Sequence, residues 1–214
     1  MASWKDIHPA IKDECRDKYD NDHYAAAVSF AIIELNDTIK KYIKNIYEIE
    51  MDGAELFRRV FSPQKSILRF RKEDDQTSKS LQEGYMQIFT GVWIGIRNPN
   101  AHKNLGIDSI EAYEIITICS HLFRIFDKAK KNNLLRLDEI DTDILKNLQK
   151  KDFLFFNNKK DPRRWINIKG TLHHIHDGNT YGSIVKLNMH LNHPTLITSE
   201  YLRTLNPGPE IISK

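Results

Sequence analysis

YAAAVSFAIIELNDTIKKYIKNIY, residues 24–47, is the most regular stretch of the sequence. Its apolar side chains recur every three or four residues, as on one face of an α-helix. Asn21 or Asp22 stands before the run and can cap the first turn. We therefore predict a long amphipathic helix that ends near Tyr47. Its apolar stripe consists of Tyr24, Ala27, Val28, Ala31, Ile32, Leu35, Ile39, Tyr42, Ile43 and Ile46.

Helical spacing continues on both sides of this stretch. Before it, an apolar stripe from Trp4 to Tyr19 predicts one amphipathic helix. After it, Asp52 opens a shorter helix, with Glu55 in a capping-box position and Pro63 as the stop. Residues 71–80, RKEDDQTSKS, contain no apolar side chain and are expected to form an exposed loop.

Two more helices are predicted before residue 130. One carries an apolar face from Leu81 to Ile96, runs into Arg97 and is broken by Pro99. The next begins near Asp108 or Ser109, and its apolar band is so broad that this helix is expected to be central. The fold class predicted is mainly α, a bundle of about five helices.

The pattern changes after residue 150. KDFLFF, WINI, LHHIH and SIVKLNM are short apolar or alternating runs separated by turn residues, and they predict short strands. We expect a helical domain over 1–150 and a small α/β or β-rich appendage over 151–214. The appendage carries nine Lys and Arg against five Asp and Glu, so it is the more basic part.

Composition excludes several classes of protein. No apolar run is long enough for a membrane span, and MASWKDIHPA is too polar for a signal peptide, so a cytoplasmic protein that has no membrane partner is expected. Cys15 and Cys119 are expected to be reduced thiols in the core.

The break after the fourth helix reads GIRNPNAHKN, residues 95–104. It places a permanent cation (Arg97), an amide (Asn98) and a titratable imidazole (His102) close together. Cleavage of RNA needs a base for the ribose 2′-OH, an acid for the leaving 5′-oxygen and positive charge beside the phosphate. Histidine titrates near neutral pH, and arginine has the geometry for phosphate oxygens. This scheme requires no metal and no other cofactor.

Spacing alone is weak evidence for this site. In a chain with 11 Arg and nine His, an Arg followed by a His at such a distance arises by chance, and Arg16 with His23 is a second example. His23 is a further candidate for a substrate contact, but a local hydrogen bond at a helix start is the favoured interpretation.

A longer set of residues resembles a known family. RNPNAH after a long apolar helix is similar to the signature of the HEPN superfamily, which is Arg, a polar residue, and His after four to six residues. The resemblance is closer to a bacterial and phage subgroup called Ymh or abortive-infection-like. It includes HPAI (8–11), the run from Cys15 to Val28, DG (52–53) and GIRNPNAH (95–102), and it extends over roughly residues 7–130.

The resemblance implies a helical bundle that forms a homodimer, in which two copies of the motif build one composite site. It also implies a metal-independent endoribonuclease, a hydrolase that acts as a toxin or antiviral effector, with an antitoxin or sensor protein as a further partner. Arg97 and His102 would be catalytic, and Asn98 would support them. Some such toxins carry a modifiable Tyr two positions after the His, where this chain has Asn104.

Other residues are candidates for RNA binding or for a metal. Lys103 stands beside the motif, and Arg163, Arg164 and Trp165 could bind RNA, with the indole stacked on a base. His174 and His176, with Asp177 or His190, form a weaker metal candidate.

Three functions remain open from the sequence. They are a metal-independent ribonuclease, a non-catalytic module that binds nucleotide, nucleic acid or protein, and a metal-dependent nuclease that uses the tail histidines.

Overall fold

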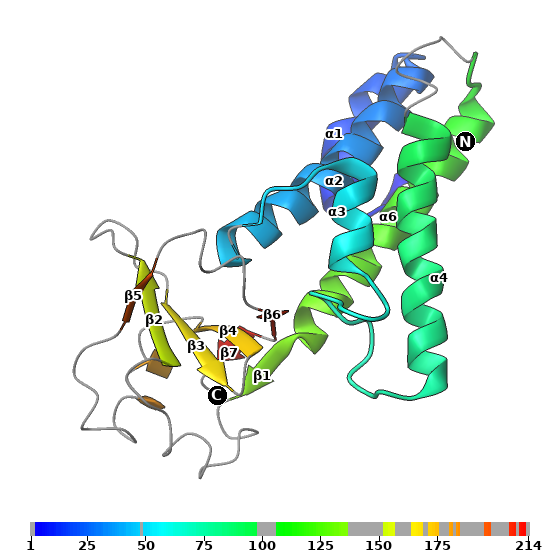
Figure 1. Ribbon diagram of the computed structural model, residues 1–214. Coiled ribbons are helices and arrows are strands. Elements are labelled where there is room, and N and C mark those ends of the chain that lie inside the picture. Colours follow the sequence, from blue (N-terminus) through cyan, green and yellow to red (C-terminus); the bar gives the residue numbers. More distant parts are fainter. Residues whose placement is uncertain are drawn as a thin grey trace. The chain divides into compact units, whose positions relative to one another are not determined.

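The computed structural model describes residues 3–47, 49–97, 106–136, 152–156, 164–168, 171–175, 180–181, 183–184, 195–197, 206–208 and 210–212. The chain forms two compact units (Figure 1). The helical unit contains Met1–Tyr42 and Glu50–Lys130, and the sheet unit contains Ile43–Ile49 and Lys131–Lys214. The predicted fold class, mainly helical with a small C-terminal sheet, is confirmed.

The helices follow the predicted order with changed bounds. They are η1 (Trp4–Asp6), α1 (Pro9–Asp20), α2 (Tyr24–Tyr47), α3 (Gly53–Val60), α4 (Gln76–Val92), the π-helix η2 (Trp93–Arg97) and α6 (Ser109–Asn132). No helix among these described residues is both long and apolar enough to cross a membrane.

The prediction of one helix from Trp4 to Tyr19 is wrong, because η1 and α1 are separate. Pro9 occupies the first turn of α1, where a residue without an N–H group is tolerated. The last turn of α1 ends at Asn21, whose side chain donates to the Asp17 carbonyl oxygen at 2.7 Å. Trp4 is still buried with the α1 stripe, which explains why the spacing looked continuous.

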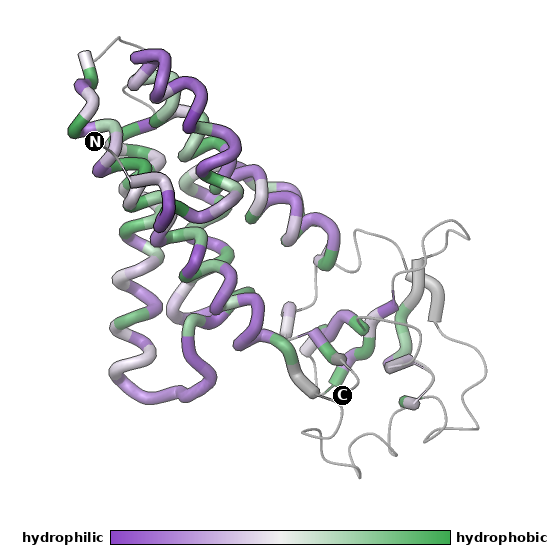
Figure 2. Tube along the Cα trace, turned by 180° about the vertical axis from the view of Figure 1, so that it is seen from behind, coloured by the Kyte–Doolittle hydropathy of each residue, from purple (hydrophilic) through white to green (hydrophobic). Residues whose placement is uncertain are grey.

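The loop predicted over 71–80 is wrong in its second half, because α4 begins at Gln76. Asp75 caps this helix, and its Oδ1 accepts the Ser78 N–H at 2.7 Å. The residues that enter α4 are hydrophilic (Figure 2), so apolar periodicity does not reveal its first turn. The first N–H groups of a helix have no acceptor inside the helix, and the Asp75 side chain supplies one. This polar sequence can therefore start a helix.

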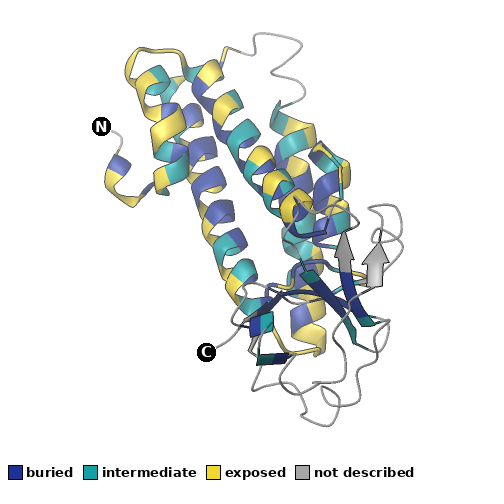
Figure 3. Ribbon diagram, turned by 90° about the vertical axis from the view of Figure 1, so that its left-hand side faces the viewer, coloured by how far each residue is buried: buried dark blue, intermediate teal, exposed yellow. Residues whose placement is uncertain are grey.

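The helical unit is closed by apolar faces of α1, α2 and α6, and buried residues follow one side of each long helix (Figure 3). Ile32, Leu35 and Phe126 have at most 1% of their surface exposed. The Tyr42 and Phe126 rings meet edge to face at 5.6 Å. Burial raises the pKa of the Cys15 thiol to about 12, and both cysteines are free, buried thiols. The central position predicted for α6 is confirmed by its long buried side.

Three of the segments predicted to be strands form an antiparallel run in the sheet unit. These are β2 (Phe153–Phe156), β3 (Arg164–Ile168) and β4 (Thr171–Ile175). Four shorter described strands join them in parallel pairs: β1 (Leu134–Arg136), β5 (Thr195–Ile197), β6 (Asn206–Pro207) and β7 (Glu210–Ile212). The order is β1-β7-β4-β3-β2-β5, and β6 pairs with β4.

One predicted strand differs. Within SIVKLNM (183–189), Ser183 and Ile184 are helical, and the remaining residues lie outside the described part. Ile184 belongs to the core of the sheet unit together with Phe153, Ile166, Ile175 and Ile211. Its apolar character therefore reflects burial and not a strand.

The last turn of α2 is bound within the sheet unit. Trp165 has no exposed surface, and its Nε1 donates to the Ile46 carbonyl oxygen at 2.8 Å. The Tyr47 hydroxyl donates to the Gly208 carbonyl oxygen at 2.7 Å. The final carbonyl groups of a helix have no partner inside it, so Trp165 satisfies one of these acceptors.

We expect Trp165→Phe to lower the free energy of unfolding by about 2 kcal/mol, because it leaves a buried carbonyl unsatisfied and removes part of a packed ring. Denaturant titration checks this value. Tyr47→Phe is the matched comparison, because it also removes the donor to a buried carbonyl but keeps the whole ring, and it should cost about 1 kcal/mol. Unchanged stability of Trp165→Phe combined with weaker RNA binding would contradict the buried role.

Candidate functional site

Arg97 is the last residue of η2, directly after α4. The other residues predicted at this site, Asn98, His102 and Lys103, lie outside the described residues. The surroundings of Arg97 can therefore be built from the helices that precede it.

The helical hydrogen-bond pattern changes over Trp93–Arg97, where α4 widens into a π-helix. Single π turns inside α-helices are rare and are frequent at functional sites. Gly91 precedes the change and Gly95 lies within it, and glycine is the weakest helix former after proline. Pro99 follows and disfavours continuation of the α-helix. The local sequence thus explains why the regular helix ends before Arg97.

The Arg97 guanidinium stacks over the ring of Trp93, with its carbon 4.8 Å from the ring centroid. Such a cation–π contact contributes roughly 0.5–1 kcal/mol at an exposed site and about 2 kcal/mol when desolvated. The two residues are four apart, a spacing at which side chains on one helix meet. The cation of the motif is therefore held against a rigid aromatic surface.

Trp93 is held in turn by α3. Its ring lies edge to face with Phe57, at a centroid distance of 6.3 Å. At Gly53 a Cβ atom would stand only 2.5 Å from Trp93 Nε1, so a larger residue would collide with the indole. Gly53 also has a φ of +56°, a left-handed conformation that favours glycine. Glycine thus meets both requirements, the close indole and the left-handed backbone.

A buried amide fixes the start of α3. Asn36 on α2 is 1% exposed, and its Oδ1 accepts the Gly53 N–H at 2.9 Å. Its Nδ2 donates to Asp52 Oδ1 at 2.6 Å, and Lys40 Nζ donates to Asp52 Oδ2 at 3.0 Å. Burial alone would raise the pKa of Asp52, but hydrogen bonds from Lys40 and Asn36 outweigh it and the pKa is lowered. The carboxylate stays ionised and keeps these donors in place.

These contacts connect two parts of the quoted motifs, DG (52–53) and the segment that starts at Gly95. Sequence reasoning missed the residues that join them, Asn36 and Trp93. The signal available was the Asp–Gly pair, since an isolated glycine at a helix start often marks a special backbone conformation. Chemically, the arrangement can hold a positive charge at the end of a helix for an anionic group.

The competing pair, Arg16 and His23, is placed differently. Arg16 lies on α1, and its Nε donates to Asp20 Oδ2 at 3.3 Å, one turn along the same helix. His23 is exposed between α1 and α2, and its main-chain N–H donates to the Lys18 carbonyl oxygen at 2.8 Å. The pair belongs to the opening helical hairpin, as expected.

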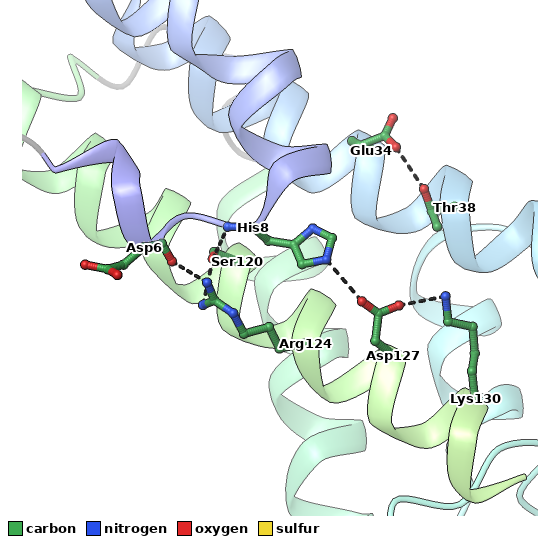
Figure 4. Close-up of polar contacts among 8 residues, drawn as sticks. All are labelled: Asp6, His8, Glu34, Thr38, Ser120, Arg124, Asp127 and Lys130. Atoms are coloured by element: carbon green, nitrogen blue, oxygen red, sulfur yellow. Dashed lines mark hydrogen bonds and ion pairs between the residues drawn. The ribbon is translucent and has the colours of Figure 1, made fainter.

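A second polar cluster lies where HPAI meets α6 (Figure 4). The His8 ring stacks on Phe123 at 4.8 Å, and its Nε2 lies 3.1 Å from Asp127 Oδ2. Burial alone would raise the pKa of Asp127, but hydrogen bonds from Lys130 and His8 lower it. Ser120 Oγ accepts the His8 main-chain N–H at 2.8 Å.

This cluster does not form a nucleophilic Ser–His–Asp site, although it contains those residue types. The Ser120 hydroxyl bonds the main chain of His8 and not its ring, and Ser120 is 1% exposed. A catalytic serine needs the imidazole as its base. The cluster instead fixes the entry into α1 against α6.

In the sheet unit, the structure describes two of the three residues predicted to contact RNA, Arg164 and Trp165. Arg164 stacks over the Tyr181 ring at 4.8 Å, and Arg163 lies outside the described residues. Trp165 is completely buried, so the expectation that its indole stacks on a base is wrong. Two adjacent arginines suggested an exposed segment, but they do not predict to which side of the sheet the following Trp165 side chain points.

Of the residues in the metal candidate, the structure describes only His174. His174 Nδ1 pairs with Glu210 Oε1 at 2.7 Å, and both side chains are buried. His176, Asp177 and His190 lie outside the described residues. Among the residues that the structure does describe, no group of three or more His, Cys, Asp or Glu side chains could hold a metal ion.

Comparison with known proteins identifies one family. The model of the Hypoth_Ymh family, described as a protein of unknown function, matches residues 5–126. The matched range contains the Trp93–Arg97 contact, the contacts of Asn36 with Asp52 and Gly53, and the contact of His8 with Ser120. No curated protein and no solved structure matches the chain.

We expect Gly53→Ala to lower the free energy of unfolding by roughly 2–4 kcal/mol, because the left-handed backbone and the indole both oppose a Cβ. Gly84→Ala on α4 is the matched control, since an added methyl meets no atom within 4 Å there. It should be neutral or stabilise by up to about 1 kcal/mol. Thermal and denaturant unfolding measure both, and equal effects would contradict the close packing of Trp93.

Proposed function

This chain belongs to the Hypoth_Ymh family, and we propose that it is a metal-independent endoribonuclease of the HEPN type that works as a homodimer. Its catalytic residues are Arg97 and His102, with Asn98 in support. We further propose that it serves as a toxin or phage-defence effector in the cytoplasm, restrained or triggered by an antitoxin or sensor protein.

The observation that carries the proposal is the contact between Arg97 and Trp93. A guanidinium stacked at 4.8 Å on an aromatic ring, at the end of a helix whose hydrogen-bond pattern has changed, has a defined position. Its sequence context, with His102 five residues later and Pro99 between, is the HEPN-like motif. A fixed cation followed, five residues later in the sequence, by a titratable imidazole supplies the groups that phosphodiester cleavage requires.

The chemistry follows from these two groups. An imidazole takes the proton of the ribose 2′-OH, and the 2′-oxygen then attacks phosphorus. The bond to the 5′-oxygen breaks, and that oxygen takes a proton from an acid. Arg97 offsets the negative charge that builds on the phosphate oxygens. The products are a 2′,3′-cyclic phosphate and a 5′-hydroxyl, and DNA, which lacks the 2′-OH, is not cleaved.

An exposed apolar surface on α4 and α6 supports the homodimer. Ile88 and Ile118 are 47% and 42% exposed, and the two helices are joined one turn away by Tyr85 and His121, whose Oη and Nε2 are 2.9 Å apart. We call this the α4–α6 face. Ile94 of η2 and Ile110 of α6 are further large apolar side chains that are exposed.

Glycine on α4 makes this face open to close helix packing. Gly84, Gly91 and Gly95 share a side of the helix with Ile88, at spacings of three and four residues. No atom lies within 4 Å of a Cβ built at any of them. Large exposed apolar side chains beside such an uncovered stretch of helix are typical of interfaces. A twofold pair of this face would bring two copies of the motif together, because η2 continues α4.

Additional contacts with RNA are assigned to basic residues. Lys103 follows His102 directly, and Arg163 and Arg164 lie in the basic C-terminal unit. We propose that they bind backbone phosphates and add affinity without sequence preference.

Arg97→Ala and His102→Ala should each reduce RNA cleavage by about 10²–10⁴-fold, because each removes one element of transition-state stabilisation. The assay contains EDTA and mixed RNAs, and sequencing maps the product ends. Circular dichroism verifies that each variant is folded, and His23→Ala is the matched control that should keep full activity. Full activity of either motif variant would refute the assignment. Tight RNA binding with no cleavage by the wild type would favour a non-catalytic module instead.

Ile88→Asp and Ile118→Asp should weaken the homodimer by roughly 100-fold or more, because each places an unpaired charge in an apolar interface. Cleavage should fall in parallel. Sedimentation velocity over a range of concentrations reports the oligomeric state. Phe30→Asp is the control, since Phe30 is also 42% exposed but lies beside Lys18 of α1. A wild-type monomer with full activity would refute the composite site.

A further inference from the structure

We infer that Trp93 is a positioning residue for Arg97, and that the Asp52–Gly53 corner exists to hold its indole in place. This inference rests on the proposed function, because it assigns how the proposed catalytic cation is oriented. Arg97 is the group that meets phosphate, and Trp93 acts through it.

A guanidinium binds phosphate oxygens through its edges. Its N–H bonds lie in the plane of the group, and its flat face carries no donor. The Arg97 guanidinium carbon lies over the Trp93 ring, 4.8 Å from the ring centroid. This contact limits the rotation of a long side chain and thereby sets the direction in which the N–H edges point.

The Trp93 indole is held by two contacts with α3. Trp93 is in contact with Gly53 on one side and with Phe57 on another, and these two residues lie one turn apart on α3. The Cβ position of Gly53 would lie 2.5 Å from Nε1 and 2.7 Å from Cε2. The indole thus fills the space that the glycine leaves, and it has little room to shift toward α3.

Hydrogen bonds fix the Asp52–Gly53 corner in turn. Gly53 N–H donates to Asn36 Oδ1 at 2.9 Å and to Asp52 Oδ1 at 2.9 Å, and Asn36 is almost completely buried in α2. Two acceptors therefore converge on one main-chain donor. A chain of direct contacts runs from α2 through the start of α3 to the indole and then to the guanidinium. The buried Asn36 amide is its fixed end.

Arginine positioning has a kinetic consequence that differs from simple binding. A cation held where charge develops lowers the barrier because it does not have to reorganise during the reaction. Loss of the aromatic face should therefore reduce mainly kcat. From the usual strength of a cation–π contact, the loss is roughly 3- to 30-fold.

The experiment compares wild type, Trp93→Leu, Trp93→Phe and Arg97→Ala in RNA cleavage with EDTA present. Trp4→Leu is the matched control, because Trp4 is a buried indole of the same unit that packs on Tyr19 and Tyr113. We expect kcat to fall roughly 3- to 30-fold in Trp93→Leu, with most of it restored in Trp93→Phe, which keeps an aromatic face. Trp4→Leu should lower stability without lowering kcat at a temperature where it is folded.

A spectroscopic readout accompanies the kinetics and needs no RNA. In the wild type the ring current of Trp93 should shift the Arg97 side-chain proton signals upfield in the NMR spectrum, and Arg97→Lys assigns them. Trp93→Leu should return these signals to ordinary values, and Trp4→Leu should leave them in place. Signals that do not move in Trp93→Leu would overturn the stack.

The two proposals fail in different ways. If the wild type and Arg97→Ala both leave RNA intact, the ribonuclease assignment is refuted. The inference that Trp93 orients Arg97 for catalysis is then refuted as well. If Arg97→Ala loses activity while folded Trp93→Leu keeps the wild-type kcat, the ribonuclease stands and the role of Trp93 is overturned. If Trp4→Leu loses as much kcat as Trp93→Leu, the effect is one of general packing, which also overturns it.

Discussion

Gly53 has a hydrogen where other residues carry a Cβ, and the indole of Trp93 occupies the space beside it. The close approach sets where α4 and η2 lie against α3, and with them the position of Arg97. Asn36 and Asp52 keep the glycine in its left-handed conformation through two hydrogen bonds to one N–H group. The missing Cβ of Gly53 is thus linked, through the Trp93 indole, to the position of the Arg97 charge on another helix.

Apolar periodicity was sufficient to predict the long helices, because burial of one face is what stabilises them. The bounds of α2 agree with the prediction from its stripe, and the central position of α6 follows from its broad band. Periodicity failed where main-chain hydrogen bonding decides the structure. Pro9 separates η1 from α1, and Asp75 starts α4 within a polar run. The parallel pairing of β1 with β7 joins residues far apart in sequence, and no local pattern encodes it.

The sequence was enough to propose the chemistry of the site, but not the contacts that support it. Arg97, Asn98 and His102 could be named from residue type, spacing and resemblance, since these are the side chains that the proposed reaction would use. The contact of Trp93 with Arg97 was missed, although the two residues are four apart, because the helix was expected to break there and not to continue as a π turn. Trp165 shows the opposite error. Its neighbours Arg163 and Arg164 suggested exposure, but alternate residues of a strand face opposite sides, and its indole is buried.

The last turn of α2 has its hydrogen-bond partners far along the chain. Ile46 is bound by Trp165, and Tyr47 bonds Gly208, so these contacts join segments separated by 119 and 161 positions. Domains are generally completed from the N-terminus during synthesis. On the ribosome, the Ile46 carbonyl therefore gains this donor only after residue 165 has emerged, and the Tyr47 hydroxyl gains its acceptor only near the end of synthesis. Under the proposed function, in which cleavage would harm the cell that makes the protein, translation itself then delays completion of the fold.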